Sequence, residues 1–91
     1  MKTSYLKCQY KKGLWEGEYL INFNATNQRH CNVNKNDVLV FNNQSYVKCS
    51  LVEEFKAEAI VWINDVGDQR VSAFRVPRSD LMDRLEEKQA A

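Results

Sequence analysis

Hydrophobic and polar residues alternate along most of this chain, with the period of two that is typical of strands with one buried face. In one segment, Tyr19, Ile21 and Phe23 share a face. Residues 38–41 and 59–63 are instead apolar on both faces, as expected for strands in the middle of a core. The pattern predicts five or six short strands within residues 4–77, at 5–10, 19–24, 38–41, 47–51, 59–63 and 71–76.

The period changes after Pro77, which ends the last predicted strand. Ser79 or Asp80 can cap a helix. An apolar stripe at helical spacing follows, formed by Leu81, Met82 and Leu85. We therefore predict a short C-terminal α-helix over about 79–89. Because such a helix is marginal in water by itself, its stripe must pack against the barrel or dock on another protein or a second copy. The sequence leaves both alternatives open.

Two further segments resemble a known architecture. Residues 19–24 and 34–41 resemble the first half of SH3 domains, in which a strand is followed by a loop, a turn and an apolar strand. Asn36 stands where the turn glycine would be, and asparagine can adopt the same left-handed backbone. Residues 76–81 are similar to the short turn that closes such barrels. The adjacent tryptophans and the tyrosine pair of SH3 domains are missing, so the resemblance implies the barrel and not a proline-peptide groove.

Length and composition fit this architecture. A chain of 91 residues forms one domain, here 1–91, with a modest core in which an enclosed active site would be hard to fit. We expect it to be mostly β, a small antiparallel SH3-like barrel of five to six strands with a short C-terminal α-helix. Such barrels host many unrelated functions, so the fold assigns none.

The chain carries no signal for a membrane. No apolar run approaches the roughly 20 residues that cross a bilayer, and Lys7 interrupts the N-terminal segment before it could form the apolar stretch of a signal peptide. We expect a cytoplasmic protein without a membrane partner. A net charge of +1 predicts neither a protein that coats nucleic acid nor a DNA mimic.

The residue types that bind metals are present but poorly spaced for a site. Zinc sites that can be recognised in sequence use ligand pairs two to four residues apart. Here only His30 and Cys31 are close, and adjacent residues of a strand point to opposite faces. Cys8 and Cys49 fall on apolar faces, and an odd number of cysteines without a CxxC motif argues against a disulfide framework. We expect no metal and no other cofactor.

Catalytic signatures are also missing from the sequence. His30 is surrounded by asparagine and arginine in what reads as an exposed loop, so no cysteine–histidine pair is predicted. The three glycines are scattered and form no phosphate-binding loop. We expect a protein that is not an enzyme and has no evident small-molecule substrate.

Basic and aromatic residues are interleaved in two places, the first hairpin and the last strand. The basic residues in question are Lys7, Lys11, Lys12, Arg70 and Arg75. Small barrels bind single-stranded nucleic acid by stacking bases on aromatic rings beside a basic track. Edge lysines also discourage aggregation, and Phe74 alternates with Ser72 as a core residue would. Nucleic-acid binding through these five residues is therefore the alternative function.

The two tryptophans differ in their surroundings. Trp15 follows a turn glycine, Gly13, and has polar flanks, so it is either a partner-contact anchor or a cover for the open end of the barrel. Trp62 lies in the most apolar strand and is expected in the core. The preferred function is a non-enzymatic protein-interaction module, that is, a regulator, inhibitor or accessory subunit. Its predicted contact residues are Tyr10, Trp15, Arg75 and Arg78.

Overall fold

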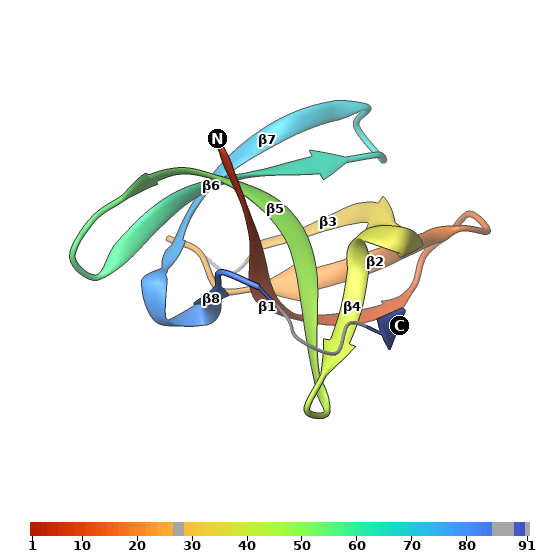
Figure 1. The fold of residues 1–91 in the computed structure, drawn as a ribbon. Coiled ribbons are helices and arrows are strands. Elements are labelled where there is room, and N and C mark those ends of the chain that lie inside the picture. Colours follow the sequence, from red (N-terminus) through yellow and green to blue (C-terminus); the bar gives the residue numbers. More distant parts are fainter. Residues whose placement is uncertain (27–28, 85–88, 91) are drawn as a thin grey trace.

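The chain folds as one curled, antiparallel β-sheet, a half-barrel (Figure 1). The computed structural model describes residues 1–26, 29–84 and 89–90. Its strands are β1 (Lys2–Lys12), β2 (Glu18–Phe23), β3 (Arg29–Asn34), β4 (Val38–Phe41), β5 (Gln44–Glu54), β6 (Glu58–Asp65), β7 (Arg70–Pro77), β8 (Leu81–Met82) and β9 (Gln89–Ala90). Two short 3-10 helices are interspersed, η1 (Lys35–Asp37) and η2 (Arg78–Asp80).

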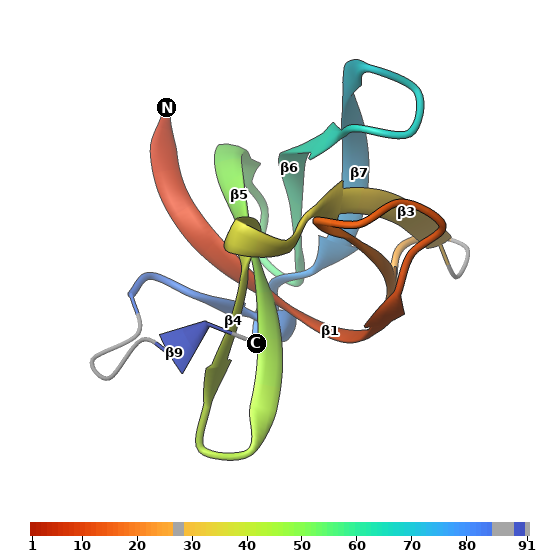
Figure 2. The same ribbon diagram turned by 90° about the vertical axis from the view of Figure 1, so that its right-hand side faces the viewer.

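The long strands β1 and β5 make the sheet curl, because each changes partner along its length. The first part of β1 pairs with β5, and its last four residues pair with β2. The first part of β5 also pairs with β4, whereas its end pairs with β6. β3 is added beyond β2, and β7 beyond β6. β3 and the β6–β7 hairpin therefore face each other across the open side of the half-barrel (Figure 2).

The alternating residues of these strands form the core. Its most deeply buried side chains are Leu6, Ile21, Val33, Val38, Val47, Val61, Ile63 and Val76. Phe74 packs against this cluster and meets the ring of Phe23 edge-on, with 4.9 Å between centroids, which confirms that it contributes to the core. The strand at 29–34 was missing from the prediction, although Cys31 and Val33 alternate inward there.

Trp62 corrects a prediction. It was expected in the core but lies on the outer face of β6, where 39% of its surface is exposed. The alternation of β6 turns Ala59, Val61 and Ile63 inward and leaves Trp62 outward. Among the described residues no second layer covers that outer face, so an apolar side chain there stays exposed.

The predicted C-terminal helix is wrong over its described part. The described residues contain no α-helix, and 3-10 helix η2 leads instead into strand β8, in which Leu81 and Met82 pair with Leu6 and Tyr5 of β1. Strand pairing with β1 satisfies backbone groups that a marginal isolated helix would have to satisfy alone. Leu81 packs on the core; Leu85 lies outside the described residues.

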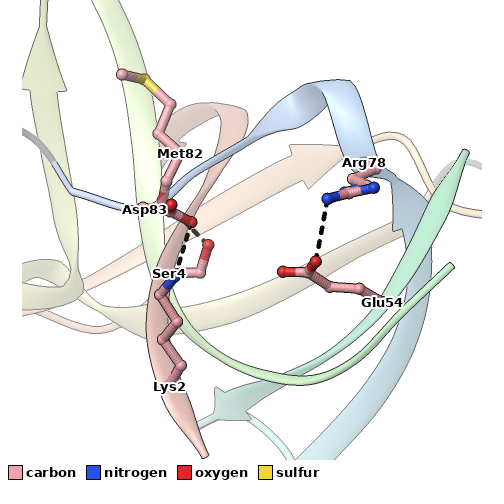
Figure 3. A network of polar contacts seen from close by, with 6 residues as sticks. All are labelled: Lys2, Ser4, Glu54, Arg78, Met82 and Asp83. Carbon is pink, nitrogen blue, oxygen red and sulfur yellow. Dashed lines mark hydrogen bonds and ion pairs between the residues drawn. The ribbon is translucent and has the colours of Figure 1, made fainter. Parts of the chain in front are cut away.

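Polar contacts fasten this returning segment to the start of the chain (Figure 3). The Ser4 hydroxyl donates to the carbonyl oxygen of Met82 at 3.0 Å, and the Lys2 ammonium lies 3.2 Å from a carboxylate oxygen of Asp83. Since η2 and β8 follow β7, the short turn predicted at 76–81 is present and brings the chain back to β1.

The left-handed turn predicted at Asn36 is elsewhere. Asn36 lies in η1, where its N–H donates to the side chain of Asn34 at 2.9 Å. Positive φ angles occur instead at Asn42 (52°) and Asn43 (61°), in the turn that joins β4 to β5. Two consecutive left-handed residues are typical of a type I′ hairpin turn, for which asparagine is favoured.

Candidate interaction surfaces

The turn between β1 and β2, residues 13–17, presents two large apolar side chains to solvent. Leu14 is 93% exposed and Trp15 is 70% exposed. We call this turn the hairpin tip. The Trp15 indole therefore does not fold over the open end of the barrel, which was one of the two alternatives that the sequence left open.

Backbone hydrogen bonds hold the hairpin tip in one conformation. The Gly13 N–H donates to the Glu18 carbonyl at 3.0 Å, and the Glu18 N–H donates to the Trp15 carbonyl at 3.2 Å. The N–H of Lys35, at the start of η1, donates to the Gly17 carbonyl at 2.9 Å. Gly17 has a φ of 87°, in the region that favours glycine. The two exposed side chains thus stand on an ordered turn that is tied to a second part of the chain.

Tyr10 lies behind the tip and is engaged with another aromatic ring. Its ring centroid is 4.9 Å from that of Tyr19 on β2, with the planes tilted by 34°. The β1–β2 register pairs Tyr10 with Ile21 and Lys12 with Tyr19, so the two tyrosines are diagonal neighbours. Tyr10 keeps 38% of its surface exposed and can widen a contact centred on Trp15.

Arg75 and Arg78 lie around the turn between β5 and β6, a region that we call the arginine end. The Arg75 guanidinium carbon sits 5.1 Å above the Phe55 ring, and its Nη1 lies 3.4 Å from the Glu58 carboxylate. Arg78 Nη2 lies 3.1 Å from Glu54 (Figure 3), while its Nη1 donates to the Phe55 carbonyl at 3.4 Å. Both arginines are therefore engaged within the molecule.

The four predicted contact residues thus form two groups. Figure 1 shows the β1–β2 turn and the β5–β6 turn on opposite sides of the molecule. Tyr10 and Trp15 belong to the first, and Arg75 and Arg78 to the second. A single small contact cannot include both.

The five residues of the nucleic-acid alternative are also distributed over several elements. Lys7, Lys11 and Lys12 lie along β1, and Lys7 lines a pocket of about 270 Å³ with Asp80. Arg70 lies at the β6–β7 turn, 3.5 Å from Asp68. Arg75 belongs to the arginine end. Both of these arginines share their charge with a carboxylate, and the basic residues do not gather on one element.

The cysteines are buried free thiols. Burial raises the pKa of Cys49 to about 12. Burial also raises the pKa of Cys8 and of Cys31 to about 12, with a smaller contribution from Cys31 in the first case and from Asp65 in the second. These thiols stay protonated near neutral pH and are poor nucleophiles.

The remaining candidate chemistry does not converge. His30 lies in β3 rather than in a loop, but it is exposed, and its Nδ1 is 3.0 Å from Asn22 Oδ1. In the part of the chain that the structure describes, no three His, Cys, Asp or Glu side chains are grouped closely enough to hold a metal ion. The same part contains no helix with the length and apolar character that crossing a bilayer requires.

Comparison with protein-family models, with curated proteins and with solved structures finds no match. The proposed function therefore rests on the exposed residues of this chain.

Several exposed apolar residues escaped the sequence prediction. They include Leu14, Val52, Phe55 and Val71. Leu14 had a visible signal, because an apolar residue between a turn glycine and Trp15 has no strand to bury it. Val71 also had one, because the assignment of Phe74 to the core face places Val71 on the opposite face, together with Arg75.

Proposed function

We propose that this chain is a non-enzymatic protein-interaction module, acting as a regulator, inhibitor or accessory subunit, and that it contacts its partner through the hairpin tip. The observation that carries the proposal is the exposure of Leu14 and Trp15 side by side on an ordered turn. Tryptophan is enriched among the residues that dominate protein interfaces. An anchor that is already ordered loses little conformational entropy when it binds.

The charge of the surroundings supports a protein partner over nucleic acid. Lys11 and Lys12 precede the hairpin tip, but Glu16 and Glu18 lie within and beside it. Such mixed charge suits the polar rim of a protein interface. Nucleic-acid binding through Lys7, Lys11, Lys12, Arg70 and Arg75 remains the alternative proposal, and it predicts affinity that falls steeply with salt.

The proposal also includes the fold of the chain and its location in the cell. We infer an SH3-like barrel, supported by the 3-10 turn η2 and the return of β8 to β1. A cytoplasmic location is supported by the three free thiols, since reducing compartments keep cysteines unpaired.

Trp15→Ala tests the function. Partner proteins are captured from a lysate on immobilised wild type and on the variant, and the bound proteins are quantified by mass spectrometry. We expect the variant to keep its circular dichroism spectrum and to lose at least about tenfold of the specific partner, because truncating a central tryptophan typically costs about 2 kcal/mol or more. Val52→Ala is the matched control, since Val52 is exposed but lies on β5, away from the tip.

Two outcomes would contradict the proposal. Capture of the same proteins at the same level by Trp15→Ala would remove the hairpin tip as the contact. Recovery of nucleic acid in place of protein, released by raising the salt concentration, would favour the alternative.

A further inference from the structure

A second surface, independent of the hairpin tip, lies along the outer edge of β7. Among the described residues β7 pairs with β6 alone, so its other edge offers backbone N–H and C=O groups to solvent. β3, β8 and β9 also pair with a single strand among the described residues, but β8 and β9 are only two residues long, so β3 is the other long strand with a free edge. That edge is covered in part, because the Val66 N–H of the β6–β7 turn donates to the Asn32 carbonyl at 2.9 Å.

There is room beside β7 for another chain. A cleft of about 490 Å³ opens between β3 and β7, next to the point where the β6–β7 turn touches β3. From β7 it is lined by residues 70–74, and from β3 by Arg29 and His30. In Figures 1 and 2 the β6–β7 hairpin lies above β3, and the hydrogen bond between Val66 and Asn32 joins the two near the turn.

The middle of β7 lacks the features that protect natural edge strands. Such strands are shortened, bulged, or carry lysine or proline on the edge. β7 is eight residues long, its register with β6 is continuous, and its only proline is the final residue. Residues 71–74 carry no charge. An edge of this kind is suited to pairing with an additional strand.

The outer face next to this edge is apolar. The β6–β7 register places Trp62 directly opposite Ala73. Val71, two residues before Ala73 in β7, is 58% exposed. Cross-strand neighbours on one face interact directly. A strand added beyond β7 would therefore place its own alternate side chains beside Ala73 and Val71 and cover apolar surface.

Charge indicates which kind of strand fits. β7 carries Arg70 and Arg75, one on each side of its uncharged middle, and no acidic residue. Their ion pairs with Asp68 and Glu58 are exposed and 3.5 and 3.4 Å long, so they contribute little. Each guanidinium has five N–H donors and can bind a further carboxylate. Two copies of β7 edge to edge would juxtapose four arginines, whereas a strand with acidic flanks is complementary.

We propose that β7 binds an extended segment of a partner protein by strand addition, and that this segment has an uncharged, β-branched centre flanked by Asp or Glu. Main-chain hydrogen bonds supply affinity, and the two arginines and the apolar outer face supply selectivity.

Selection of peptides from a display library of random twelve-residue sequences on the immobilised protein tests the proposal. Recovered peptides are synthesised and titrated into the ¹⁵N-labelled protein. We expect enrichment of β-branched centres with acidic flanks, and the largest amide shifts in β7. Enrichment without acidic flanks, shifts that map elsewhere, or no recovered peptide would overturn it. A dimer of the protein alone in light scattering, lost in Ala73→Lys, would show that a second copy is the occupant instead.

Variants locate the site. Ala73→Lys and Arg75→Glu should each weaken peptide binding at least about tenfold, the first by placing a charge on the edge and the second by repelling the acidic flank. Val52→Lys should leave binding unchanged, because Val52 is exposed on β5 and β6 lies between β5 and β7. Trp15→Ala should also leave it unchanged, so failure of this proposal and failure of the hairpin-tip function are separate results. Equal weakening by Val52→Lys would show that added charge alone is responsible and would contradict the assignment to β7.

Discussion

The hairpin tip and the arginine end each carry an aromatic side chain at a turn between two strands, but the surroundings of that side chain differ. At the arginine end, Arg75 covers Phe55, and Glu58 and Glu54 neutralise the two arginines. At the hairpin tip, Trp15 is exposed, and the hydrogen bonds that hold the turn run between backbone groups. The first turn satisfies its side chains within the molecule, and the second leaves them available.

This difference shows why residue type alone is a weak guide to a contact surface. An arginine near an aromatic residue is a common interface pair. Here Arg75 and Phe55 form that pair within the chain, so a partner that contacts the Phe55 ring would have to displace the Arg75 guanidinium, whereas an added carboxylate would not. A partner that binds Trp15 has no such pair to displace. The hairpin tip is therefore the stronger candidate for a contact surface, although it has fewer polar groups.

The comparison assumes that both turns are attached to the same hydrophobic core. The three buried cysteine thiols of that core test this assumption, and they give the largest expected effect on the free energy of unfolding. Because the folded-state pKa values of the cysteines are raised from 9.0 to about 12, the folded protein holds these protons more tightly than the unfolded chain. The contribution of the thiols to the free energy of unfolding is complete below about pH 9 and is lost as the pH rises towards 12. Each thiol should lower the free energy of unfolding by about 1 kcal/mol per pH unit in that window.

Urea unfolding at pH 7.5, 9 and 10, followed by circular dichroism, measures this loss. A variant with Cys8→Ala, Cys31→Ala and Cys49→Ala is the control and should show a shallower decline. If the protein instead unfolds in two steps, the two turns do not share the core that the comparison requires. If stability declines as steeply without the cysteines, the buried thiols do not cause the decline.

The sequence predicted much of this core and less of its surroundings. Alternation located most strands because burial of one face imposes a period of two. It missed β3, in which only Cys31 and Val33 are apolar among asparagines that resemble a loop. It also placed Trp62 inside, since residues 59–63 are apolar on both faces and the sequence does not reveal that only one of these faces is covered.

The C-terminal error has a different cause. The spacing of Leu81, Met82 and Leu85 suited a helix. The pairing of Leu81 and Met82 with β1 is a contact between distant parts of the chain, which local spacing cannot reveal. The candidate surfaces show the same limit. Trp15 could be singled out from its polar flanks, whereas the cover that Arg75 gives Phe55 and the free edge of β7 depend on long-range pairing.

Gly13→Ala sharpens the comparison at the hairpin tip, with an intermediate effect. A Cβ at this position would lie 2.9 Å from the Glu18 carbonyl oxygen, which is backbone and already accepts the Gly13 N–H. Forcing these atoms apart should cost about 1–3 kcal/mol of unfolding free energy. Urea unfolding measures the cost, and Leu14→Ala, in a side chain that is almost fully exposed, should change it by less than about 0.5 kcal/mol. Equal costs for the two variants would mean that the tip is not fixed by its backbone.

The smallest expected effect is at the arginine end. A double-mutant cycle with Arg78→Ala and Glu54→Ala should give a coupling energy below about 1 kcal/mol, because both side chains of the 3.1 Å ion pair are about half exposed. Salt should reduce the coupling further. Lys2→Ala with Asp83→Ala, an exposed pair at 3.2 Å, provides the matched cycle. If Arg78 and Glu54 couple by several kcal/mol without responding to salt, the arginine end is a rigid structural element. If they couple as weakly as Lys2 and Asp83, a partner could displace the pair, and the contrast between the two turns would be one of degree.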